Sequence, residues 1–149
     1  MQRAELATLL VEAGNAEREA LLSNNSALAG VELAYLLKDI CLNGWSSDPA
    51  QAIGAASAIQ ALADRTNNAE IAALSFWAQG LEALIRGEME RAITNLDESQ
   101  ARFLALDKPH TAAATQVSKL IALSMLGRYE EAIQCGLHAR DVFLEHNDL

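Results

Sequence analysis

The sequence has few aromatic residues and few prolines. Aromatic side chains make up 5% of the 149 residues, and Pro49 and Pro109 are the only prolines. Both stand where a helix is expected to begin, and a helix tolerates proline there because the missing N–H would be unpaired anyway. Apolar residues make up 51% of the chain, and alanine is abundant. This composition favours one all-α domain built from closely packed helices.

Basic residues are also scarce. Eleven lysines and arginines against twenty aspartates and glutamates give a formal net charge of −9. The basic residues are scattered, so binding to nucleic acid or to an anionic membrane is disfavoured. No apolar run is long enough to span a bilayer, and the first residues lack the apolar core of a signal peptide. We therefore expect a cytoplasmic protein with no nucleic-acid or membrane partner.

Only two cysteines occur, Cys41 and Cys135. We expect both to be small buried residues in a reduced compartment rather than a disulfide. Cys135 lies one helical turn from His138, and His146 follows two turns later, but no further ligand stands at a suitable spacing for a metal. A Cys–His pair with no third residue to orient it does not predict a nucleophile either. We expect no catalytic residue, no metal and no cofactor.

What the sequence does contain is a unit that repeats every forty residues. Residues 126–133 predict a glycine-centred turn between two helices, and the same layout occurs at 85–93 and, more faintly, at 47–53. The coinciding residues include Gly87 with Gly127, Phe103 with Phe143, the row Ala52, Ala92 and Ala132, and the row Ile53, Ile93 and Ile133. Each unit has a mostly apolar helix followed by an amphipathic one. This order is typical of stacked helical hairpins, in which the first helix is covered on both sides.

The predicted helices form an N-terminal cap and three hairpins. Residues 1–26 fit the repeat poorly and predict a helical cap or a degenerate repeat. Residues 27–149 predict hairpins over 27–65, 69–106 and 109–146, and the first helix is expected over 27–43. In the last helix the spacing predicts an inward face of Tyr129, Ala132, Ile133, Gly136, Ala139 and Phe143.

These residues resemble the tetratricopeptide repeat (TPR) family. Gly127, Tyr129 and Ala132 match the family's turn, and in the preceding copy Gly80, Gly87 and Ala92 match its first-helix glycine and turn. The forty-residue unit is longer than the usual thirty-four, and Leu120 replaces the first-helix glycine in the last copy. Repeats of this length are similar to the arms of large bacterial multidomain proteins, such as those with CHAT protease domains. The resemblance implies a right-handed α-solenoid that acts as an interaction scaffold without catalysis.

The resemblance also implies a binding surface, because in this family the first helices line a concave face that holds the ligand. By register, that face would include Leu37, Cys41, Trp77, Leu81, Val117 and Ile121. Such an apolar groove suits an amphipathic helix or a hydrophobic peptide, with Trp77 as the anchor. The alternative interpretation is that these residues simply pack between helices.

We therefore predict a non-catalytic scaffold that binds a peptide or partner protein. We also expect it to be an arm of a larger protein or assembly, because no capping helix follows the last predicted hairpin. Two other functions are open. A self-association module would have a large apolar interface at its first or last helix, with the groove empty. A small-ligand sensor would have a deep closed pocket near Trp77.

Overall fold

The computed structural model describes residues 1–145, and this part of the chain is all α-helical, with no β-strand. The eight α-helices are α1 (Arg3–Glu12), α2 (Asn15–Asn24), α3 (Val31–Gly44), α4 (Pro49–Thr66), α5 (Ala69–Ile85), α6 (Met89–Ala105), α7 (Pro109–Met125) and α8 (Tyr129–Glu145). A short 3-10 turn, η1 (Ser26–Leu28), joins α2 to α3. The predicted all-α fold is confirmed. His146 lies outside the described residues.

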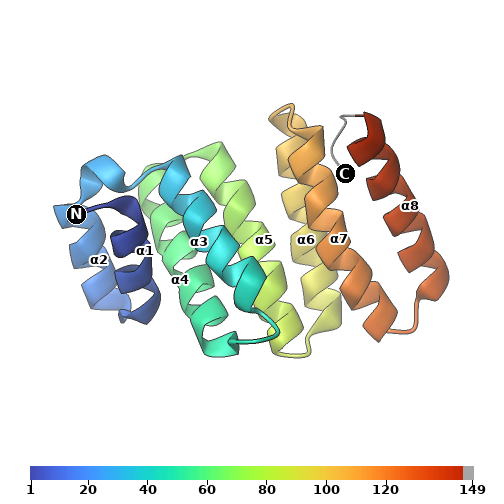
Figure 1. Ribbon diagram of the computed structural model, residues 1–149, viewed down its shortest axis with the longest axis horizontal. Coiled ribbons are helices and arrows are strands. Elements are labelled where there is room, and N and C mark those ends of the chain that lie inside the picture. The colour runs from blue at the N-terminus through green and yellow to red at the C-terminus, as the bar shows by residue number, and fades with distance from the viewer. Residues whose placement is uncertain (146–149) are drawn as a thin grey trace.

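From α3 onwards, helices that follow one another in the chain lie side by side in one row (Figure 1). From α3 onwards each helix packs against the next, and α3 also packs against α5. At the start of the row, α1 packs against α3 and α4. At the other end, α8 packs against α7 and has no described helix beyond it (Figure 1). The two ends of the row are therefore closed to different degrees.

Glycine makes the turn inside each of the last two hairpins. Gly87 and Gly127 have φ angles of 75° and 76°, a left-handed conformation that glycine adopts without steric cost. The next N–H then donates to a carbonyl five residues back, as Glu88 does to Ala83 at 2.9 Å. This bond satisfies one of the unpaired carbonyls at the helix end. The two turns predicted from the forty-residue offset are thus also equivalent in conformation.

Short polar side chains begin two of the helices. The Asp48 carboxylate accepts from the backbone N–H of Gln51 at 3.3 Å, and Pro49 takes the first helical position, as the sequence predicts. Asn68 accepts from the backbone N–H groups of Glu70 and Ile71 in the same way. These caps fix where α4 and α5 start.

The first helix of the first hairpin starts later than the sequence predicts. The apolar run from Ala27 predicts a helix over 27–43, but α3 begins at Val31. Gly30 takes an extended conformation at its N-cap, with φ −131° and ψ −164°. Glycine inside a helix costs about 1 kcal/mol relative to alanine, so the chain uses Gly30 as a break after the 3-10 turn.

Small residues let the helices approach closely. Ala52, Ala92 and Ala132 are all buried at equivalent places on the second helices. Gly54 brings α4 against α1 so closely that a Cβ there would lie 2.3 Å from the carbonyl oxygen of Val11. The core is therefore continuous along the row, rich in alanine, and sensitive to added volume.

Candidate interaction surface

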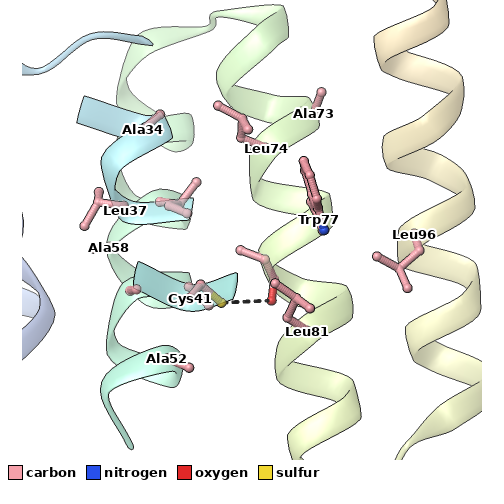
Figure 2. Close-up of a cluster of buried hydrophobic side chains, with 14 of the residues drawn as sticks. Ala34, Leu37, Cys41, Ala52, Ala58, Ala73, Leu74, Trp77, Leu81 and Leu96 are labelled. Carbon is pink, nitrogen blue, oxygen red and sulfur yellow. Dashed lines mark hydrogen bonds between the residues drawn. The ribbon is translucent and has the colours of Figure 1, made fainter. Parts of the chain in front are cut away.

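Four of the six residues predicted to line a concave groove lie in the core. Leu37, Cys41 and Leu81 are fully buried, and Trp77 is nearly so. Figure 2 shows them in the cluster of side chains between α3, α4, α5 and α6. A partner could reach these four only if the hairpins separated, so the interpretation as packing residues describes them.

Trp77 connects four helices. Its Nε1–H donates to Ser118 Oγ on α7 at 3.2 Å. Its ring meets that of Phe103 on α6 edge to face, with centroids 6.4 Å apart. The Lys38 ammonium on α3 lies 4.9 Å from the ring centroid, a cation–π distance. Because the indole is enclosed on these sides, its role in this structure is to hold the hairpins together.

The two cysteines differ in surroundings. The Cys41 Sγ lies 3.9 Å from the carbonyl oxygen of Ala78 (Figure 2), and burial raises its thiol pKa to about 12, with the Glu82 charge adding to the shift. Cys135 is half-buried, with Sγ 3.2 Å from the carbonyl oxygen of Gln116. Its pKa is also raised by burial. Among the described residues, no three His, Cys, Asp or Glu side chains converge as metal ligands.

The other two predicted residues, Val117 and Ile121, lie on α7. This is the last of the first helices α3, α5 and α7, and its outer face is not covered by another described helix. Val117 is 47% exposed, although Trp77 and Leu37, forty and eighty residues earlier, are buried. Ile121 is partly exposed. Residues of the inner first helices are covered by the next first helix: α5 lies against α3, and Trp77 contacts α7. No described first helix follows α7, so Val117 has no such cover.

The last of the second helices, α8, is likewise less covered than its counterpart α6. Ile133 on α8 is 61% exposed, whereas Ile93, forty residues earlier on α6, is 8% exposed. Tyr129 and Leu137 are exposed on the same side of α8. The prediction that Tyr129 and Ile133 face inward is wrong. A helical period shows which residues share a face, but the following first helix is what buries that face, and α8 has none among the described residues.

Tyr129, Ile133 and Leu137 form an exposed stripe along α8. On the inner second helices, α4 and α6, the corresponding stripe makes polar contacts with the next first helix. Gln60 Oε1 on α4 accepts from Ser75 Oγ at 3.2 Å and from Gln79 Nε2 at 2.5 Å, both on α5. Asp97 on α6 pairs with Lys119 Nζ on α7 at 2.9 Å. Gln79 and Lys119 are equivalent residues, so one position of each first helix contacts the stripe of the helix before it.

Two of these polar positions hold a different kind of residue on α8, one apolar and one positively charged. Leu137 stands forty residues after Asp97, and Arg140 stands forty residues after Gln100 and eighty after Gln60. The Arg140 guanidinium contacts Asp141 Oδ1 at 3.1 Å and is otherwise exposed. The exposed stripe on α8 thus has an apolar residue where α6 has Asp97, and one cation, Arg140, about one turn beyond it.

An apolar hollow of about 380 Å³ lies between α7 and α8 on this side. We call it the end groove; its lining residues are Leu120, Ser124, Tyr129, Ala132, Ile133, Gly136 and Leu137. Val117 and Ile121 belong to the same face of α7 as Leu120 and Ser124, by helical spacing. Sequence reasoning missed this groove, although the change from Asp97 to an apolar residue at position 137 was a signal for it.

No helix in the described part of the chain is both long enough and apolar enough to cross a bilayer. In comparisons with protein-family models, with curated proteins and with solved structures, the chain matches none. The resemblance to TPR proteins therefore stays a prediction that rests on the residues named above.

Proposed function

We propose that this protein is a non-catalytic scaffold that binds a peptide or partner protein through the end groove. The observation that carries the proposal is a difference between two equivalent residues. Ile93 is buried in the inner hairpin, whereas Ile133 is exposed in the last one. Contiguous exposed apolar patches on soluble proteins mark interaction sites. Val117, which is exposed, and Ile121, which is partly exposed, are the members of the predicted binding set that adjoin this patch.

The proposal extends to the architecture and setting. The hairpins form a TPR-like, right-handed α-solenoid that serves as an arm of a larger protein or assembly in the cytoplasm. The equivalent turns at Gly87 and Gly127 support the repeat. The buried alanines Ala92 and Ala132 support close stacking of the hairpins.

Self-association is the second candidate, because the exposed stripe on α8 would serve it equally well. The net charge of −9 opposes it, since two copies repel each other before their apolar faces meet. We therefore place a different partner first.

Site-specific photo-crosslinking in cells that express the protein natively tests the proposal. A photoreactive residue replaces Ile133 or Val117, and Glu98, exposed on α6, serves as the control position. We expect one discrete heavier adduct from the first two positions and none from Glu98. The protein found in that adduct is then purified and titrated against the wild type and Ile133→Asp, and the variant should bind about tenfold more weakly or worse. Equal adducts at all three positions, or equal binding by the two proteins, would contradict the proposal.

A further inference from the structure

We infer that the partner presents a single amphipathic α-helix, which lies in the end groove as α7 lies against α5 and α6. It presents an apolar side chain to Leu137 and a carboxylate to Arg140. This inference rests on the proposed function and adds the shape and chemistry of the partner.

The repeated interface indicates a helix as the occupant. α7 contacts two preceding helices at once: Ser118 accepts from Trp77 on α5, and Lys119 pairs with Asp97 on α6. The end groove offers the equivalent pair of surfaces, with Val117 forty residues after Trp77 on the first helix. A helix that continues the row would contact α7 and α8 together.

The inner contacts also assign the facing positions of that helix. Ser75 and Gln79 are the residues of α5 that bond to Gln60, so their equivalents in an incoming helix would lie beside Arg140. The equivalent of Gln79 and Lys119 would also lie over Leu137, because Lys119 pairs with the residue at that place on α6. Two positions one turn apart therefore decide specificity.

The chemistry at these two positions differs from the inner interfaces. On α6 the carboxylate of Asp97 pairs with Lys119, but α8 has the apolar Leu137 at that place. A lysine of the incoming helix would bury its ammonium against Leu137 without a partner, so an apolar residue is preferred there. Beside Arg140, a carboxylate would form a charge-assisted hydrogen bond with an otherwise exposed guanidinium. A second copy that pairs α8 with α8 would instead bring two Arg140 side chains to one stripe.

Stapled helical peptides test this assignment with the full chain. The first peptide has the sequence of residues 109–126, and the second carries Thr115→Glu and Lys119→Leu, the changes that match Arg140 and Leu137. Circular dichroism confirms that both are helical, and fluorescence anisotropy measures binding. We expect saturable binding of the substituted peptide and about tenfold weaker binding of the unsubstituted one.

Two protein variants sharpen the test. Leu137→Asp restores the carboxylate found at Asp97, so it should reverse the preference in favour of the peptide that keeps Lys119. Leu104→Asp changes an exposed apolar residue of α6 outside the groove, and it should bind both peptides as the wild type does.

Each alternative result overturns the inference in a recognisable way. If the crosslinked protein binds and neither peptide does, the partner is not a helix in this groove, although the proposed function stands. Equal binding of the two peptides, or no change with Leu137→Asp, would refute the assigned positions. A dimer in sedimentation equilibrium that Ile133→Asp dissociates would make a second copy the occupant. If the crosslinked protein and the peptides all fail to bind, the proposed function fails as well.

Discussion

Cys41 and Cys135 differ in how completely their neighbours shield the sulfur. Cys41 is enclosed between α3 and α5, and its neutral thiol is favoured because burial removes water from the thiolate and Glu82 adds a negative charge nearby. Cys135 faces the edge of α7 and has Lys119 close enough to lower its pKa in part, although burial still raises it overall. The same residue type is therefore expected to behave differently at the two places.

We predict that a disulfide reagent labels Cys135 in the folded protein and labels Cys41 only after unfolding. With a pKa of about 12, Cys41 has on the order of one thiolate in ten thousand at pH 8, and it is fully buried. Labelling with Ellman's reagent should be fast in Cys41→Ala and slow in Cys135→Ala. Equal rates in the two variants would show that α3 and α5 separate readily.

The raised pKa of Cys41 also predicts a pH dependence of stability. Its folded-state value lies above the unfolded one, so the contribution is full below about pH 8.5 and is lost as the pH rises towards 12. The free energy of unfolding should therefore fall more between pH 8 and pH 10.5 in the wild type than in Cys41→Ala.

At the scale of helices, the last two hairpins each pack a leucine against a glycine where their two helices cross, but the two residues stand on opposite helices in the two hairpins. In α5–α6, a Cβ on Gly80 would lie 2.7 Å from Leu96 Cγ, so glycine makes the space that leucine fills. In α7–α8, Leu120 stands at the Gly80 position and Gly136 at the Leu96 position. A Cβ on Gly136 would lie 2.9 Å from Leu120 Cδ1. The bulk of Leu120 is thus compensated by a glycine on the facing helix.

This exchange predicts strong coupling between the two positions. Gly136→Leu alone should overpack the α7–α8 crossing and cost about 1–3 kcal/mol of unfolding free energy. Adding Leu120→Gly copies the α5–α6 arrangement and should recover most of that loss. Urea denaturation of both single variants and the double variant gives the coupling energy. Additive effects would mean that the two residues do not fill one space.

At the scale of the whole molecule, much of the fold could be predicted from the sequence. The forty-residue offset gave the helical hairpins, and the turn glycines followed because Gly87 and Gly127 have equivalent surroundings. Ile53, Ile93 and Ile133 look alike in sequence, yet they differ in exposure. Exposure depends on the next helix, which lies outside the segment that shows the period. The late start of α3 was missed for a related reason, since an apolar run alone does not show where the backbone breaks.

The candidate site was less predictable than the fold. Leu37, Cys41, Trp77 and Leu81 follow the first-helix pattern, but that pattern does not distinguish a groove from a contact between helices. The end groove depends on where the row of described helices stops, as Figure 1 shows for α8. The partner and the relation to TPR proteins stay predictions.

The central claim is that one repeated interface is buried inside the row and open at α8. Measuring the unfolding free energy of Ile93→Ala and Ile133→Ala by urea denaturation tests it most directly, because the two isoleucines are equivalent in the repeat and differ in cover. We predict a loss of about 2–5 kcal/mol for Ile93→Ala. We predict a change within about 0.5 kcal/mol for Ile133→Ala. Equal losses in the two variants would contradict the account, because they would mean that the α8 face is already buried.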